Sequence, residues 1–387
     1  MSRTDVEICT GAGDHGAEGD HGAVVPPVYQ STVFTQPSLA RFAEQQSQEH
    51  ERPVYSRGAN PTVAVLERAL AELERGEACK CFGSGMGAIS ALWMSLLREG
   101  DHVLLLNDVY GPTLQLAQHL RAFGIEHTVV RDPSEGVEPH LRESTALIHL
   151  ESPGTMRMKV LDLRAISRVA RSRGITTVID NTWATPLFQK PIELGIDVVV
   201  HSCSKYLGGH SDVIGGAVVG RRELVRDLFY RGFQLFGSVM SATEASLVLR
   251  GLRTLPLRMA EHERNAKEVV DFLRTRPEVE AVHHPHADLA ADDPLLRDQL
   301  SGLSGLLSFD LADRSPAAVA RVVDALSLFR IGVSWGGYES LVTSPLKPGG
   351  EAQLLEQGFS PGMIRLSVGL EGAARQVADL ERALDSL

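Results

Sequence analysis

The chain has 387 residues, of which 43% are hydrophobic and 22% are charged, as in an ordinary globular protein. Its formal net charge of -11, from 38 Lys and Arg against 49 Asp and Glu, disfavours nucleic acid or an anionic membrane as the main partner. No apolar run approaches the ~20 residues that span a bilayer, and the first residues lack the apolar core of a signal peptide, so we expect a cytoplasmic protein.

The first sixty residues differ in composition from the rest of the chain. Runs such as "GAVVPPVYQSTVF" and "ERPVYSRGANPT" contain too much proline and glycine for a long helix, and they predict an extended arm over residues 1–60. From Cys79 onward, apolar runs such as "HVLLLND", "TTVIDNT" and "DVVVHS" alternate with amphipathic runs such as "LRAISRVARSRG". This alternation predicts an α/β domain over 61–240, with a mostly parallel, doubly wound sheet and helices on both faces.

The pattern changes again over residues 241–387. A long helical run, "SATEASLVLRGLRTLPLRMAEHERNAKEVVDFLRTRP", precedes two strand-like runs, "VEAVHHP" and "GLLSFDLA". The helical run "PAAVARVVDAL" and a last amphipathic helix over 373–387 complete the chain. These elements predict a smaller α+β C-terminal domain.

Ligands of an open parallel sheet bind beyond the carboxyl ends of its strands, so the residues after each strand are the candidates for a site. The small-residue turn "GSGMGA", Gly83 to Ala88, opens a helix, and its free N–H groups can bind a phosphate. Tyr110 lies in a turn after the next strand, where its ring can stack against a planar ligand. These two features indicate a phosphorylated aromatic ligand.

Two ionisable residues come after later strands. Asp180 ends an apolar strand, where a carboxylate is costly unless it meets a cation such as a protonated ring nitrogen. Lys205 follows another strand, between Ser202 and Ser204, and partial desolvation would lower its pKa and make it nucleophilic. A phosphate site, a stacking ring, an acid and a strand-end lysine are together what pyridoxal 5'-phosphate requires.

Eight motifs, in order along the chain, resemble the Cys/Met-metabolism family of pyridoxal-phosphate enzymes. They are "VYSRGANPT", "GSGMGA", "LESPGT", "IDNTWATP", "HSCSKYLGGHSDVIGG", "GLRTLPLRM", "VSWGGYESL" and "IRLSVGLE". The resemblance runs from about Val25 to the C-terminus. It implies the family's fold-type I architecture and an amino-acid substrate that contains sulfur.

The resemblance also implies roles for particular residues. Lys205 would bind the cofactor covalently and transfer protons, and Tyr110 would stack on the cofactor and take part in catalysis. The other residues implied to bind the cofactor are Gly85, Met86, Asp180, Asn181, Ser202 and Ser204, together with Tyr55 and Arg57 from the neighbouring subunit. Arg365, Ser334 and Tyr55 would bind the substrate. The family pattern therefore implies a homo-oligomer, expected to be a tetramer built from catalytic dimers.

Within this family the motifs favour one reaction. Trp335 stands where the γ-enzymes usually have leucine, so "VSWGGYESL" resembles the cystathionine β-lyases, as do "IDNTWA" and "KYLGGHSD". The expected activity is cleavage of L-cystathionine and related S-substituted cysteines to homocysteine or another thiol, pyruvate and ammonia. Val333 instead resembles the methionine γ-lyases, so cystathionine or methionine γ-lyase and γ-synthase activities stay open as alternatives.

Two hypotheses come from other classes of protein. Asp108 lies ~20 residues beyond "GSGMGA", where the carboxylate of a dinucleotide oxidoreductase would contact a ribose, but this leaves Lys205 and Arg365 without a role. A non-catalytic binding protein of the same fold is the second hypothesis, and the presence of Lys205, Asp180 and Arg365 argues against it.

Two groups of histidines resemble metal ligands. They lie in "DHGAEGDHG", Asp14 to Gly22, and in "HHPH", His283 to His286. Neither spacing fixes a closed ligand geometry. We therefore assign no metal site.

Overall fold

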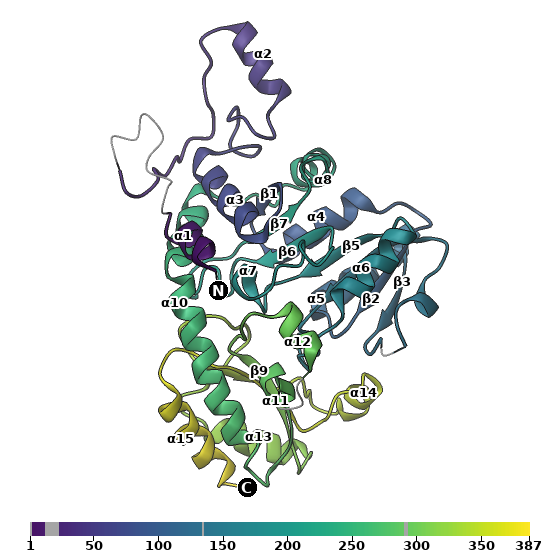
Figure 1. Cartoon of the computed structure of the whole chain (residues 1–387), viewed down its shortest axis with the longest axis vertical. Helices are drawn as coiled ribbons and strands as arrows, with labels where there is room; N and C mark the ends of the chain where they lie inside the picture. The colour runs from purple at the N-terminus through teal and green to yellow at the C-terminus, as the bar shows by residue number, and fades with distance from the viewer. Residues whose placement is uncertain (1, 12–22, 134, 290–292) are drawn as a thin grey trace.

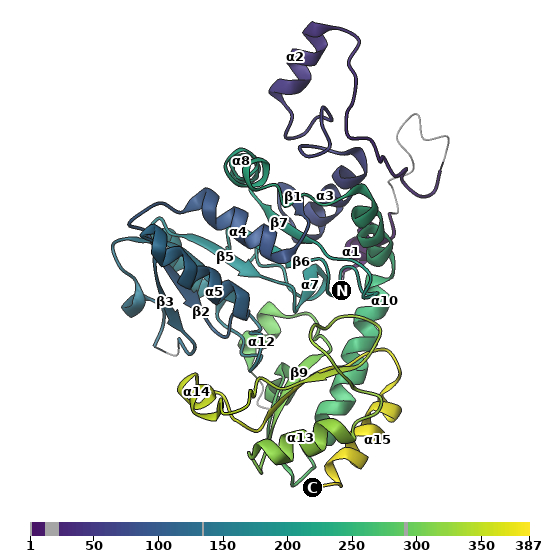
Figure 2. The same cartoon turned by 180° about the vertical axis from the view of Figure 1, so that it is seen from behind.

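The structure is a computed structural model that describes residues 2–11, 23–133, 135–289 and 293–387. The "DHGAEGDHG" segment lies outside these residues. Figures 1 and 2 show a large sheet with helices above a smaller sheet, with the long helix α10 (Ala242–Leu273) running beside both. None of the helices in the described part of the chain has the length and apolarity that a membrane crossing needs.

The large sheet has seven strands among the described residues, in the order β1-β7-β6-β5-β4-β2-β3. They are β1 (Ala78–Phe82), β2 (His102–Leu106), β3 (Glu126–Val130), β4 (Thr145–Glu151), β5 (Thr176–Asp180), β6 (Val198–Ser202) and β7 (Gly216–Gly220). Strands β3, β2, β4, β5 and β6 are parallel, whereas β7 is antiparallel to both of its neighbours. The mostly parallel sheet that the sequence predicts is confirmed.

Strand β7 was not predicted, because it forms within a glycine-rich segment. Its sequence is only "GAVVG", and it directly follows the loop that carries Lys205. Its pairing with β6 brings Gly216 opposite Ser202 and close to the turn before α4. A side chain at Gly216 would overlap the backbone of Ser84, so the close approach requires glycine here.

Both faces of the large sheet are covered by helices. Helices α4 (Gly85–Leu96), α5 (Gly111–Leu120) and α8 (Arg222–Leu228) cover one face, and α3 (Pro61–Glu74) and α6 (Leu163–Ser172) cover the other. Within β2, Val103 and Leu105 pack on the first face and Leu104 and Leu106 on the second. This alternation explains why the strand is apolar at every position after His102.

The smaller sheet has five strands among the described residues, in the order β10-β11-β12-β9-β8. They are β8 (Val279–His283), β9 (Leu306–Leu311), β10 (Arg330–Ile331), β11 (Leu341–Thr343) and β12 (Met363–Ser367). The helices of this part are α11 (Pro285–Leu289), α12 (Pro294–Gln299), α13 (Pro316–Ala325), α14 (Glu351–Glu356) and α15 (Ala373–Leu384). The remaining short elements are α7 (Thr185–Phe188), α9 (Gln234–Phe236), η1 (Arg121–Phe123), η2 (Glu138–His140) and η3 (Phe229–Phe233).

Helix α10 joins the two sheets. Ser241 and Glu244 form a capping box at its start, which matches the change of pattern at residue 241. Its first half packs Leu252 into the same core as α3, whereas its second half packs Val270 into the core of the smaller sheet. The helix therefore belongs to both cores, and the predicted domain boundary at residue 241 stays a prediction.

The N-terminal region contains two short helices, α1 (Arg3–Thr10) and α2 (Leu39–Ser47), that the sequence did not predict. Each is preceded by an N-cap serine, Ser2 or Ser38, whose side chain accepts a hydrogen bond from a backbone N–H of the first turn. Helix α1 lies against α3 and α10, and α2 projects away from the body (Figure 1). Residues 23–38 of the arm, before α2, leave several large hydrophobic side chains exposed.

Candidate active site

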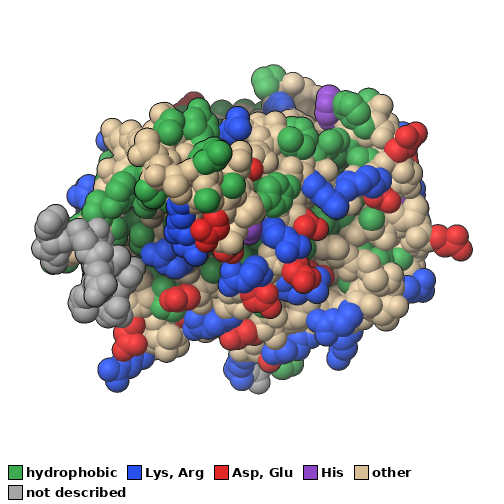
Figure 3. All heavy atoms as spheres, turned by 90° about the horizontal axis from the view of Figure 1, so that it is seen from above, with side chains coloured by type: hydrophobic (Ala, Val, Ile, Leu, Met, Phe, Trp, Pro, Cys, Tyr) green, Lys and Arg blue, Asp and Glu red, His purple; other side chains and the backbone are tan. Residues whose placement is uncertain are grey.

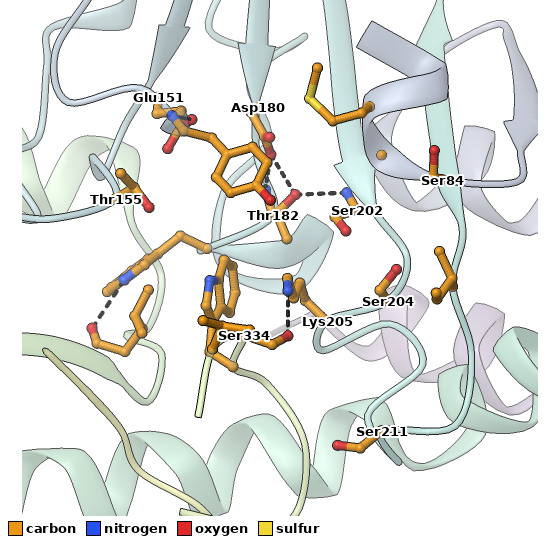
Figure 4. A pocket seen from close by; sticks show the side chains of 18 of the residues that line it. Ser84, Glu151, Thr155, Asp180, Thr182, Ser202, Ser204, Lys205, Ser211 and Ser334 are labelled. Carbon is orange, nitrogen blue, oxygen red and sulfur yellow. Dashed lines mark hydrogen bonds between the residues drawn. The ribbon is translucent and has the colours of Figure 1, made fainter. Parts of the chain in front are cut away.

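A cavity of about 490 Å³ lies at the carboxyl ends of the parallel strands, as expected for an open α/β sheet. Residues that end β4, β5 and β6 line one side of it, namely Glu151, Asp180 and Ser202. Ser334, labelled in Figure 4, lines the other side and comes from the loop between β10 and β11, whose Trp335 also lines the cavity. The cavity is therefore formed by both sheets.

One end of the cavity suits a phosphate. Gly85 and Met86 are the first residues of α4, so their N–H groups have no partner within the helix. A Cβ atom at Gly85 would lie 3.1 Å from Cβ of Ser202, so this turn packs tightly on β6. Ser202 and Ser204 line the same wall and add hydroxyl groups. Four of the predicted cofactor-binding residues thus come together here.

Asp180 lies in the wall of the cavity with its carboxylate held by Thr182. The backbone N of Thr182 donates to Oδ1 of Asp180 over 3.0 Å, and the Thr182 hydroxyl donates to the same oxygen (Figure 4). Burial raises the pKa of Asp180, and the hydrogen bonds from Thr182 oppose this effect. A protonated ring nitrogen would meet the charge of this carboxylate and remove the cost of burying it.

Lys205 faces the same cavity from the loop after β6. Its Nζ donates to Oγ of Ser334 and lies 5.6 Å from the ring centre of Trp335 (Figure 4). Burial lowers the pKa of Lys205 to about 8, and the positive charge of Arg365 adds to this effect. About a tenth of the amine is therefore neutral at pH 7, which supplies the form that a nucleophile or proton acceptor requires.

Ser334 adopts a left-handed backbone conformation, with a φ of 83°. This conformation is unusual for a residue other than glycine, and it costs on the order of 1–3 kcal/mol. It directs the hydroxyl of Ser334 toward Lys205. Backbone strain of this kind is concentrated at functional sites.

Tyr110 begins α5 at the edge of the cavity, and 47% of its surface is exposed. Its backbone N–H donates to Oε1 of Glu151, a cavity residue that the sequence did not single out. Glu151 ends β4 just as Asp180 ends β5, so the signal that revealed Asp180 was present for Glu151 as well. Burial, followed by the charge of Asp180, raises the pKa of Glu151 well above its usual value.

Arg365 lies in β12 at the margin of the cavity. Its Nη1 donates to the carbonyl oxygen of Thr155 over 3.5 Å, and Thr155 lines the cavity. Burial lowers the pKa of Arg365, and the charge of Glu151 opposes this effect. The planar guanidinium is thus placed where it can bind a carboxylate in the cavity.

Three predicted site residues lie elsewhere in the described chain. The side chain of Asn181 is buried on the opposite side of the sheet, where its Nδ2 donates to Glu74 over 2.8 Å. It is placed there because residues along a strand alternate between faces, and Asp180 faces the cavity. Tyr55 and Arg57 lie in the arm, with the Arg57 guanidinium 5.6 Å from the ring centre of Tyr55, outside the cavity of the same chain.

The dinucleotide hypothesis is wrong, because its key carboxylate is already bound. Asp108 is buried, and Arg157 donates to both of its oxygens over 3.0 and 2.9 Å. The histidines of "HHPH" also have separate partners: His283 contacts Asp310, His284 the carbonyl of Ser304, and His286 Asp271. Their rings are thus directed to three different groups.

The chain is similar to known proteins over nearly all of its length. Residues 9–385 match the family model described as Cys/Met metabolism PLP-dependent enzyme. The L-methionine gamma-lyase of Pseudomonas putida is 40% identical over 96% of this chain and 94% of that protein. The cystathionine gamma-lyase of Bacillus subtilis is 38% identical, covering 96% and 97% of the two chains. The cystathionine beta-lyase of Lactococcus lactis subsp. cremoris is 38% identical, covering 94% of each.

Solved structures show the same likeness. The cystathionine gamma-lyase of Lactobacillus plantarum, crystallised with L-serine, has a TM-score of 0.88 and 34% identity, covering 100% of this chain and 99% of that chain. The metB structure from Corynebacterium glutamicum has a TM-score of 0.88 and 31% identity, covering 98% and 97%.

The chain therefore belongs to the Cys/Met-metabolism family of pyridoxal-phosphate-dependent enzymes, and pyridoxal 5'-phosphate is its cofactor. It is a pyridoxal-phosphate-dependent carbon-sulfur lyase of that family. The cavity fits this cofactor, because it combines a phosphate-binding helix start, a buried carboxylate and a lysine with a lowered pKa.

Proposed function

We propose that the protein cleaves L-cystathionine by β-elimination and releases homocysteine, pyruvate and ammonia, and that it also accepts simpler S-substituted cysteines. The position of Trp335 carries this proposal, since its ring centre lies 5.6 Å from Nζ of Lys205. β-Elimination needs proton removal from Cα alone, whereas γ-elimination needs a second removal from Cβ. The bulky indole beside Lys205 favours the reaction with the smaller lysine movement.

The cavity residues predicted from the sequence would then have the following tasks. Gly85, Met86 and the nearby serines hold the phosphate of the cofactor, and Asp180 binds its ring nitrogen. When bound, pyridoxal phosphate withdraws electrons from Cα of the substrate. Lys205 removes the Cα proton, and Ser334 orients the amine for this step. The sulfur leaves from Cβ with the electron pair of its C–S bond and takes up a proton to form the thiol, and water converts the remaining three-carbon fragment to pyruvate and ammonia.

The substrate is held by groups at the margin of the cavity. Arg365 binds the α-carboxylate through its planar guanidinium, so that Cα faces Lys205. Ile214 and Val333 line the cavity and are 65% and 82% exposed, which provides an apolar surface for the sulfur substituent. This apolar surface supports activity on S-alkyl cysteines. Comparing kcat/KM for a series of thioethers tests this expectation. A strict preference for cystathionine would contradict it.

The complete site is proposed to require two subunits. Tyr55 is 49% exposed in the single chain, and its arm carries the exposed side chains of Val24, Val25, Val33 and Leu39. Figure 3 shows hydrophobic side chains gathered among charged ones on the face from which the arm projects. A second copy that covers this region would bring Tyr55 and Arg57 to the cavity of its partner, and pairs of dimers would form the tetramer.

A γ-lyase is the alternative that has support of its own. Val333 lines the cavity as an apolar residue, and relatives named methionine or cystathionine gamma-lyase are about as similar to this chain as those named beta-lyase. Incubating the cofactor-loaded protein with L-cystathionine and identifying the products separates the two. Pyruvate with homocysteine supports β-elimination, whereas 2-oxobutyrate with cysteine contradicts it. The Lys205→Ala variant is the control and should form neither.

A further inference from the structure

A cluster of polar side chains is buried beneath the cavity, on the face of the large sheet opposite to Asp180. Glu74 ends α3, His201 lies in β6, Asn181 follows β5 and Gln189 follows α7. Each of the four is at most 1% exposed. Polar groups buried in this way cost free energy unless hydrogen bonds compensate.

Glu74 is at the centre of this cluster. Its Oε1 lies 2.5 Å from Nε2 of His201 and accepts a hydrogen bond from Nδ2 of Asn181 over 2.8 Å. One carboxylate oxygen thus connects the end of β5 and the end of β6 to the last turn of α3. These are the two strands that carry Asp180 and Ser202 into the cavity.

The cluster is not fully satisfied. Oε2 of Glu74, Nδ1 of His201, Oδ1 of Asn181 and both polar side-chain atoms of Gln189 are buried without a hydrogen-bond partner among the described residues. Each such group loses its hydrogen bonds to water on burial without a replacement, which destabilises the folded state. Apolar residues of similar shape would avoid this cost, so stability alone does not explain why these polar groups are here.

The cluster adjoins Asp180 on two sides. Asn181 is the next residue along the chain, and His201 follows Val200, which pairs with Asp180 across β5 and β6. Above the sheet, the Thr182 hydroxyl accepts a hydrogen bond from the N–H of Ser202 over 2.8 Å and donates to Asp180. The ends of β5 and β6 are therefore linked on both faces. Burial raises the pKa of Asp180; the hydrogen bonds from Thr182 oppose this effect first, and the electrostatic interaction with His201 opposes it next.

We propose that Glu74 and His201 are positioning residues for Asp180. They hold the ends of β5 and β6 together from beneath, and the imidazole helps to keep the Asp180 carboxylate ionised for binding to the ring nitrogen of the cofactor. This inference rests on the role proposed above for Asp180. Neither residue contacts the cavity, so both act through Asp180 and its strand end.

A double-mutant cycle between His201 and Asp180 tests this proposal. Glutamine at position 201 can still donate to Glu74, but it removes the electrostatic interaction of the imidazole with Asp180. We expect His201→Gln to weaken the binding of pyridoxal phosphate to the apoprotein by ~10-fold and to change the visible absorbance of the bound cofactor. In the Asp180→Asn background, His201→Gln should weaken the binding of pyridoxal phosphate less than ~2-fold, because residue 180 no longer has a carboxylate on which residue 201 can act.

His102→Gln is the matched control. His102 is also fully buried in the large sheet and bonded to Thr145 and Thr128 over 2.9 Å each, but it begins β2, at the edge away from the cavity. A loss of cofactor affinity that is equal in both backgrounds, or equal to that of His102→Gln, would overturn the proposal. Circular dichroism checks that each variant folds.

Failure of this inference and failure of the proposed function give different results. If His201→Gln does not fold, Glu74→Gln takes its place in the same cycle, because the amide oxygen still accepts from His201 or Asn181. If Asp180→Asn alone leaves cofactor affinity and absorbance unchanged, the proposed role of Asp180 fails. If Asp180→Asn has its expected effect but no coupling to His201 is found, only the positioning role of His201 and Glu74 fails.

Discussion

Glu151 and Asp180 lie directly opposite each other in the register of β4 and β5, so two carboxyl groups meet at the edge of the cavity. A carboxyl group that is buried beside a second carboxylate is harder to ionise. The pKa of Glu151 is raised well above its usual value by burial first and by Asp180 second. Without a cationic ligand, burying these two carboxyl groups side by side destabilises the folded state.

The first prediction concerns the stability of the apoprotein. A carboxyl group whose pKa is raised on folding stabilises the folded state below its unfolded pKa of ~4.3, and this contribution is lost as pH rises through the folded value. Glu151→Gln keeps an acceptor for the Tyr110 N–H and removes the ionisation. We therefore expect it to stabilise the apoprotein by about 1 kcal/mol at neutral pH, and less at pH 4.

Thermal unfolding of the apoprotein at several pH values measures this effect. Glu223→Gln, at an exposed position of α8, is the control and should change the unfolding free energy by less than about 0.5 kcal/mol at every pH. If Glu151→Gln were destabilising at neutral pH and no less destabilising at pH 4, folding would not raise the pKa of Glu151 and the prediction would be wrong.

The second prediction concerns Lys205 and Arg365. The pKa of Lys205 is about 8, lowered by burial first and by the charge of Arg365 second. At pH 7 about a tenth of the amine is then neutral, against less than about a thousandth for an ordinary lysine. Arg365→Gln should raise the pKa of Lys205 and slow its reaction with an amine-specific reagent at pH 7.

The readout is the pH dependence of labelling at Lys205 in the apoprotein, followed by mass spectrometry of the peptide. Arg330→Gln, in the exposed strand β10, makes the same change of charge away from the cavity and serves as the control. Identical labelling profiles for wild type and Arg365→Gln would show that the arginine does not act on this amine.

Most of the site could be predicted because each feature is local in sequence. Asp180 and Lys205 follow apolar strands, and the carboxyl ends of parallel strands meet at one edge of a sheet. Asn181 illustrates the limit of this reasoning. It follows Asp180 directly, but the alternation of side chains places it under the sheet, in contact with Glu74.

Other features depend on contacts between distant segments. Glu74 lies 107 residues before Asn181, and nothing in the sequence of α3 indicates that its carboxylate lies beneath the cavity. Strand β7 forms only because β1 and β6 provide partners on either side for its short glycine-bounded run. The domain boundary is hard to predict for the same reason, because the continuous helix α10 contributes to both cores.

The third prediction tests the role of Trp335 in the choice of reaction. Trp335→Leu removes the indole beside Lys205 and contacts with Tyr206, whose ring centre lies 5.4 Å away. With more room for the lysine to reach Cβ, the ratio of 2-oxobutyrate to pyruvate formed from L-cystathionine should rise by ~10-fold or more. Trp335→Phe, which keeps an aromatic wall, should change the ratio far less. An unchanged ratio in both variants would place the control of the reaction elsewhere.

The fourth prediction tests whether the site is shared between subunits. Lys205→Ala and Arg57→Ala should each be nearly inactive when purified alone, because one lacks the catalytic amine and the other a phosphate contact. If Arg57 acts in the partner's cavity, a hybrid dimer of the two variants contains one site with both residues intact. Mixing equal amounts under conditions that allow subunit exchange should then restore about a quarter of wild-type activity, since about half of the dimers are hybrids.

In the matched control, the Arg57→Ala subunit is replaced by a subunit whose substitution lies in the same cavity as Lys205. Asp180 and Lys205 line one cavity of a single chain, so mixing Lys205→Ala with Asp180→Asn subunits gives hybrids in which both sites are damaged. That mixture should stay inactive. If the Lys205→Ala and Arg57→Ala mixture also stays inactive although subunit exchange is demonstrated with differently tagged chains, then Arg57 belongs to the cavity of its own chain, and the arm must fold back to reach it.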